Sequence, residues 1–187
     1  MVPLSFPDPP LQAQLILLRA WSDQDVPAIV AACSDPATAR FIPTMPAPYT
    51  ERDAREWLAC HEQWRSENRL ELAIAAAGTD VALGAISARV DTDNMSATVG
   101  YWLTPAARGH GHMTAALRLV CAWLFETVAL GRIALTTDPE NHASAGVARR
   151  CGFQQEGLLR SDVRHLQTGQ RRDSLTWGLL PGELTRA

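Results

Sequence analysis

The chain has 187 residues, of which 47% are hydrophobic, and it carries 17 Lys and Arg against 20 Asp and Glu side chains. This length fits one ordinary domain that buries a core without cross-links. The formal charge of -3 gives no broad field that would attract nucleic acid or an anionic membrane. No apolar run approaches the ~20 residues that a membrane-spanning helix requires. We therefore expect no nucleic-acid or membrane partner.

The four cysteines lie inside apolar patterns and form no CxxC pair. This arrangement favours buried thiols in a reducing cytosol over disulfide bonds. His110 and His112 would point apart on a helix, and no third ligand of suitable spacing lies near them. The sequence therefore predicts a cytoplasmic protein without a bound metal.

The N-terminal part predicts one strand and two helices. Residues 1–13 are rich in proline and predict an irregular arm, whereas the branched side chains of residues 15–21 predict a strand. A first helix opens at Ser22, and a second starts at Thr50, which can cap it. Between them residues 34–49 contain four prolines, which favours a loop.

From Leu70 onward the pattern changes to short apolar or alternating runs. Turn-forming residues separate three such runs, which predicts an antiparallel meander. These strands cover residues 70–77, 81–90 and 96–103, and they are followed by a helix over 113–128, a strand over 132–137, a helix over 141–152, and strands over 153–163 and 172–179. We predict a single α/β domain over residues 1–187, without internal repeats.

The stretch "RGHGHMTAAL", residues 108–117, places a glycine turn at the mouth of a helix. It lacks the Gly-Lys-Ser/Thr ending of a P-loop and the third glycine of a dinucleotide-binding turn. A strand, a tight turn and a helix N-terminus together direct unpaired amides at one point, which suits a phosphate. The residues alone leave open that Gly109 and Gly111 only form the turn and that Arg108 is a solvated charge.

The blocks "VGYWLTPAARGHGHMTAAL", "RIALTTDPENHASAGVARRCGF" and "RRDSLTWGLLPGE" resemble the GNAT acyltransferases, and within them the RimJ/RimL-like N-acetyltransferases. The resemblance covers about residues 14–183. It implies an α/β (α+β) fold with a mixed, mostly antiparallel seven-stranded sheet, flanked by about four helices and splayed at an acyl-CoA cleft. The family signature Arg/Gln-x-x-Gly-x-Gly/Ala maps to Arg108, Gly111 and Met113, and Met113 departs from it.

The resemblance implies acetyl-CoA, or another short acyl-CoA such as succinyl-CoA, as cosubstrate. Main-chain groups of the strand would contact pantetheine, and amides of the turn would hold the pyrophosphate. Arg89 or Arg160 could select a carboxylated acyl chain. The implied cofactor-binding residues are Trp102, Leu103, Arg108, Gly109, His110, Gly111, His112, Met113, Thr114, Asn141 and Ser144.

Ser144 is the candidate catalytic residue. The branch carries Asn-x-x-Ser, which Asn141 and Ser144 match, and this resemblance implies a hydrogen bond from Ser144 to the CoA sulfur. Both residues can equally serve as a helix cap. The tyrosine that protonates the leaving thiolate in many relatives is absent here, because Ala148 stands at the matching helix position. Residue chemistry alone offers three general bases, of which we assign none: Glu71, Asp162 and His165.

The function that the resemblance implies is transfer of an acetyl group from acetyl-CoA to a primary amine, either a protein N-terminus or a small molecule. The alternative is a catalytically silent acyl-CoA-binding sensor or interaction module. The missing tyrosine, the missing carboxylate on the strand before the turn, and Met113 favour that alternative. The sequence leaves open whether the protein is a monomer or a homodimer.

Overall fold

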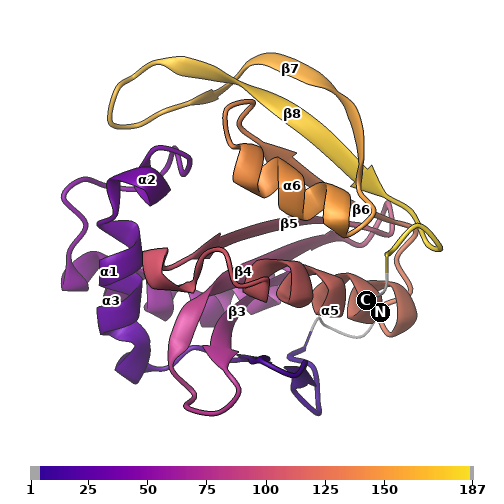
Figure 1. Cartoon of the computed structure of the whole chain (residues 1–187), viewed down its shortest axis with the longest axis horizontal. Coiled ribbons are helices and arrows are strands. Elements are labelled where there is room, and N and C mark those ends of the chain that lie inside the picture. The colour runs from indigo at the N-terminus through magenta and orange to yellow at the C-terminus, as the bar shows by residue number, and fades with distance from the viewer. Residues whose placement is uncertain (1–4, 186–187) are drawn as a thin grey trace.

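Alternating apolar side chains build one mixed eight-stranded sheet in the computed structural model, which describes residues 5–185 (Figure 1). Across the sheet the strands follow the order β1-β2-β3-β4-β5-β6-β8-β7. Neighbouring described strands are antiparallel, except that β5 and β6 are parallel. The strands are β1 Leu11–Gln12, β2 Ile16–Arg19, β3 Arg69–Ala76, β4 Ala82–Asp91, β5 Ser96–Leu103, β6 Arg132–Thr137, β7 Gln154–Arg164 and β8 Arg171–Leu179.

The helices begin where a polar residue or a glycine precedes an apolar run. Thr50 caps α3 in a reciprocal arrangement with Asp53, as expected for a second helix starting there. The α-helices are α1 Val26–Cys33, α2 Pro36–Ala39, α3 Glu51–Ala59, α4 His61–Ser66, α5 His112–Glu126 and α6 His142–Arg150, and 3-10 turns cover Asp23–Asp25 and Pro105–Ala107.

The mixed, mostly antiparallel sheet is confirmed, whereas two details of the prediction were wrong. The expected arm of residues 1–13, whose first four residues lie outside the described part, contains β1, because Leu11 pairs with Leu18 of β2. This contact makes eight strands instead of seven. The expected loop of residues 34–49 contains α2, because Asp35 caps a helix that Pro36 can start.

Two apolar clusters pack against the C-terminal end of β5, one on each face of the sheet. Because successive side chains of a strand point to opposite faces, Val99 and Tyr101 pack with α5, while Trp102 packs on the other face with α1 and α3. There the Trp102 ring stacks on Trp21 with 5.9 Å between centroids. The end of β5 is therefore held from both sides.

The parallel strands β5 and β6 part after a short contact. Their pairing covers three residues on each strand and ends where Thr98 meets Ala134. Beyond this point β5 stays paired with β4 as far as Leu103, which lies opposite Gly84. Since β5 follows β4, a gap opens between β5 and β6.

We predict that Gly84→Ala destabilises the fold, because a Cβ at this position would lie 2.2 Å from the carbonyl oxygen of Trp102. Overpacking of this kind costs about 1–3 kcal/mol. Gly78→Ala is the matched control, since a Cβ there meets no atom within 4 Å. Urea denaturation of both variants checks the prediction, and equal midpoints would contradict it.

Candidate active site

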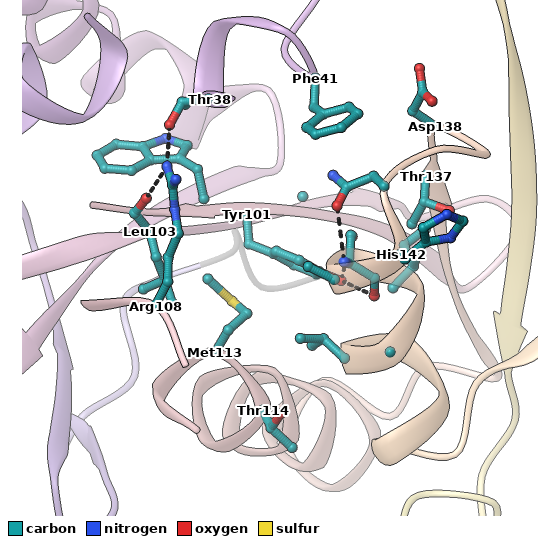
Figure 2. Close-up of a pocket in the computed structure, with 18 of the residues that line it drawn as sticks. Thr38, Phe41, Tyr101, Leu103, Arg108, Met113, Thr114, Thr137, Asp138 and His142 are labelled. Atoms are coloured by element: carbon teal, nitrogen blue, oxygen red, sulfur yellow. Dashed lines mark hydrogen bonds between the residues drawn. The ribbon is translucent and has the colours of Figure 1, made fainter. Parts of the chain in front are cut away.

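The gap between β5 and β6 opens into a cavity of about 720 Å³. Its walls come from the ends of both strands, the glycine turn before α5, the first turns of α6, and the segment around α2 (Figure 2). The residues that line it include Phe41, Tyr101, Trp102, Leu103, Arg108, Gly109, Gly111, His112, Met113, Thr114, Asp138, Asn141, Ser144 and Arg150.

The glycine turn is shaped to leave room for a ligand. Gly109 and Gly111 have φ of +80° and +81°, values that L side chains rarely adopt, and a Cβ on either would meet no atom within 4 Å. Gly111 is also the N-cap of α5. Because it has no side chain with which to cap the helix, the first amides of α5 are left for another partner. The turn therefore suits an anion that approaches the backbone closely.

Arg108 connects the turn to the opposite wall. Its Nη2 donates to Asp35 Oδ2 at 2.7 Å. The same nitrogen donates to Thr38 Oγ1 at 2.6 Å and to the carbonyl oxygen of Leu103 at 3.3 Å (Figure 2). The hydrogen bond from Arg108 lowers the pKa of the Asp35 carboxyl, and it does so more than the hydrogen bond from Thr38. Arg108 thus connects the α2 segment and the C-terminal end of β5 to the N-terminus of α5 through hydrogen bonds.

The first turn of α6 carries the candidate catalytic group. Asn141 Oδ1 accepts a hydrogen bond from the Ser144 amide at 3.1 Å, so the capping role of Asn141 is present. The Ser144 hydroxyl instead lies 3.0 Å from the hydroxyl of Tyr101. Tyr101 did not emerge from the sequence as a site residue, because its position near the end of a strand carries no signal for a contact with α6.

Most of the predicted cofactor-binding residues line the cavity, and His110 does not. Its side chain is exposed, with the ring centroid 5.6 Å from that of His112. Its predicted contact uses the backbone amide and stays a prediction. Asp138 and Arg150 are among the lining residues that were missed, because nothing in the pattern of a β6–α6 turn or a helix end marks them.

The other candidates lie outside the cavity lining. Glu71 is buried and accepts from Arg69, and burial raises its pKa. Asp162 is exposed, while His165 is buried beside the carbonyl oxygen of Ala39. The two arginines considered for acyl selection, at positions 89 and 160, are exposed and also outside the lining.

Within residues 5–185, no group of three or more His, Cys, Asp and Glu side chains is arranged to hold a metal ion. Among the helices of the same residues, none has the length and apolar character needed to cross a membrane.

Residues 16–154 match the family model described as an acetyltransferase (GNAT) domain. The chain belongs to the GNAT acetyltransferase family. Among its relatives is YdaF of Bacillus subtilis, provisionally named a ribosomal N-acetyltransferase, which is 30% identical over 142 residues, or 75% of this chain and 74% of YdaF. The predicted GNAT family is confirmed, and the RimJ/RimL-like branch stays a prediction with which the name of YdaF is consistent.

Solved GNAT structures share the fold. RimL, titled a ribosomal L7/L12 alpha-N-protein acetyltransferase in complex with coenzyme A, has a TM-score of 0.80 at 19% identity, covering 90% of this chain and 95% of its own. MccE, titled a microcin C7 self-immunity acetyltransferase with acetyl-CoA and AMP, has a TM-score of 0.80 at 19% identity, covering 90% of this chain and 93% of its own. These similarities concern the fold alone.

We predict that Arg108→Ala loosens the α2 wall of the cavity. The guanidinium is 40% exposed, so its pair with Asp35 contributes under about 1 kcal/mol to global stability, and the effect should be local. Hydrogen exchange of residues 36–42 should become faster, while Arg52→Ala, which breaks the exposed pair with Glu56, should leave this segment unchanged. Unaltered protection of residues 36–42 in Arg108→Ala would contradict the prediction.

Proposed function

We propose that this protein transfers an acyl group, with acetyl-CoA as the donor, to a primary amine by direct attack of the amine on the thioester. The observation that carries the proposal is the parting of β5 from β6 after Thr98. It leaves a cavity with the glycine turn and Ser144 both on its walls. These are the two parts that a phosphate-bearing thioester would need.

The chain's own groups fit the coenzyme part by part. The amides of residues 109–114 would hold the pyrophosphate, at a turn where both glycines leave the approach open. Main-chain groups of Leu103, on the edge of β5 that β6 leaves free, would pair with the pantetheine amides as an added strand does. The carbonyl oxygen of Trp102, predicted for the same role, instead faces Gly84 of β4. The Trp102 side chain is already engaged with Trp21, which fixes this edge.

The bound coenzyme would supply the activated acyl group, and the residues would orient it. Ser144 is the proposed donor to the sulfur, on which negative charge develops as the C–S bond breaks. No base is assigned, because an α-amine with a pKa of about 8 is partly neutral at physiological pH and can release its proton to water.

The amine would approach from the side of the cavity opposite α5. Phe41 and Asp138 lie there in Figure 2, one beside α2 and the other after β6. Asp138 is paired with Arg172 at 2.8 Å. The name of RimL points to a protein N-terminus as acceptor and that of YdaF to a ribosomal component, whereas MccE is named for microcin C7 and was solved with AMP. Peptides and small molecules therefore both belong in a screen.

The first test is release of free thiol from acetyl-CoA with a panel of peptides and small amines, with acetylated products identified by mass spectrometry. We expect release that depends on the acceptor. Succinyl-CoA is the comparison donor and should react less well, since the arginines at positions 89 and 160 lie outside the cavity lining. Saturable binding of acetyl-CoA without release across the panel would instead support the silent acyl-CoA sensor.

A second prediction concerns the glycine turn. Gly111→Ala should weaken coenzyme A binding at least tenfold, about 1.4 kcal/mol, because the new Cβ enters the space left for the phosphates. Gly182→Ala is the matched control: its φ is +93° and a Cβ there also meets nothing within 4 Å, but Gly182 does not line the cavity. Both variants should lose about 1–2 kcal/mol of stability through strain at positive φ.

Calorimetry with coenzyme A, together with thermal unfolding, separates the two effects. If Gly111→Ala bound coenzyme A as tightly as Gly182→Ala, the amides of this turn would not hold the pyrophosphate.

A further inference from the structure

The hydroxyl of Tyr101 meets the hydroxyl of Ser144 inside the cavity, although the two residues come from different elements. Their oxygens are 3.0 Å apart, and the Tyr101 hydroxyl is also placed to donate to the carbonyl oxygen of Ser144 at 3.3 Å. Figure 2 shows the Tyr101 ring reaching from β5 toward the first turn of α6. Both residues line the cavity.

We propose that Tyr101 is a positioning residue that donates a hydrogen bond to Ser144 Oγ and thereby directs the serine hydrogen toward the thioester sulfur. This inference rests on the proposed function, in which Ser144 stabilises the leaving thiolate.

The Tyr101 hydroxyl has one hydrogen and two acceptors within reach, and the proposal assigns that hydrogen to Ser144 Oγ at 3.0 Å, which is nearer than the Ser144 carbonyl oxygen at 3.3 Å. A serine hydroxyl has one hydrogen and two lone pairs, so it can accept from Tyr101 and still donate to sulfur. Among the described residues, Tyr101 is the side chain that the structure places within hydrogen-bond distance of Ser144 Oγ, since Asn141 accepts from the Ser144 amide instead. A Ser144 without Tyr101 would keep its hydrogen but lose the partner that fixes its direction.

Tyr101 keeps its proton at neutral pH and is therefore available as a donor. Burial raises the pKa of Tyr101 to about 12. The titratable and charged groups that act on it are Cys121 on α5, Cys151 after α6, and Arg150 at the end of α6. The thiols would raise the pKa further and Arg150 lowers it, while the contact with Ser144 also lowers it.

The fold holds the phenol in place through its strand. Tyr101 pairs with Ile86 of β4 and packs against the cluster beneath α5. The helix position that carries a tyrosine in many relatives is the fully buried Ala148 here. In this chain the phenol near Ser144 is therefore that of Tyr101, which extends from β5 to the first turn of α6.

The reaction balances without ionisation of Tyr101. The amine nitrogen attacks the thioester carbon, the N–C bond forms, and the pair of the C–S bond moves to sulfur. The proton of the ammonium leaves to water, and the thiolate, held by the Ser144 hydrogen, takes a proton from water on release. Tyr101 only sets the direction of that hydrogen.

The test compares two Tyr→Phe variants, because the chain contains two tyrosines. Tyr101→Phe should lower kcat about tenfold with an acetyl-CoA KM within about twofold of wild type, since a transition-state contact is weakened. Tyr49→Phe, in the apolar cluster beneath α1 and α3 and outside the cavity lining, should keep wild-type kcat.

Ser144→Ala should lower kcat by roughly 10²-fold, the loss typical of one removed transition-state donor. Adding Tyr101→Phe to it should cause no further loss beyond about twofold, because Tyr101 acts through the serine. Independent, multiplicative losses in the double variant would overturn the inference.

The pH dependence of kcat distinguishes the proposed role of Tyr101 from a purely structural one, because a structural role would leave the alkaline limb of this profile unchanged. Difluorotyrosine placed at position 101 by nonsense suppression keeps the hydroxyl but has a more acidic phenol. Its ionisation should stop donation to Ser144, so kcat should fall at a lower alkaline pH than in wild type. Coinciding profiles would overturn the inference, and this variant decides the matter even if Tyr101→Phe fails to fold.

The two proposals fail in different ways. Absence of acceptor-dependent thiol release in the wild-type protein would refute the proposed function. An active wild type whose Tyr101→Phe variant matches Tyr49→Phe in kcat would refute the role of Tyr101 alone.

Discussion

The site depends on one feature of the sheet, namely that β5 and β6 stop forming backbone hydrogen bonds with each other after Thr98. After Thr98 the two strands no longer pair, although both continue. Backbone groups that lose their partner within a sheet need another one, which can be a backbone, a side chain or water. The pantetheine arm of coenzyme A, with two amides in an extended chain, has the right chemistry for that place. The gap is therefore the feature from which both the proposed cofactor and the proposed reaction follow.

Side-chain packing keeps the gap open from two directions. On one face Trp102 stacks on Trp21, and on the other Tyr101 joins the cluster beneath α5. Arg108 links the end of β5 to α2 across the mouth. With β5 held by these contacts and by β4, the gap does not depend on the ligand for its shape. Such preorganisation reduces the ordering that binding would require.

The sequence predicted the order of the main elements well, because hydrophobic periodicity and caps are local signals. Asn141 and Thr50 were recognisable as caps from residue type and position alone. The two-residue β1 and the four-residue α2 were missed, since a short element depends on a partner that lies elsewhere in the chain, such as Leu18 for Leu11. Periodicity needs more residues than either element contains.

The candidate site was predicted in the same uneven way. The glycine turn and the Asn-x-x-Ser pair carry their meaning in consecutive residues and could be read directly. Tyr101 and Ser144 are 43 positions apart, so only the fold shows that their hydroxyls meet. Arg108 was expected to bind the cofactor, but its contact with Asp35, which shapes the cavity wall, depends on how the α2 segment folds back over the turn. Long-range polar contacts of this kind leave no periodic trace in the sequence.

Backbone amide NMR during titration with acetyl-CoA would test most directly whether the gap between β5 and β6 holds the coenzyme. The account predicts that the largest shift changes fall in two groups, the turn amides of residues 109–114 and the strand amides of residues 99–103. Saturable changes confined to other segments, such as the β7–β8 hairpin, would contradict it.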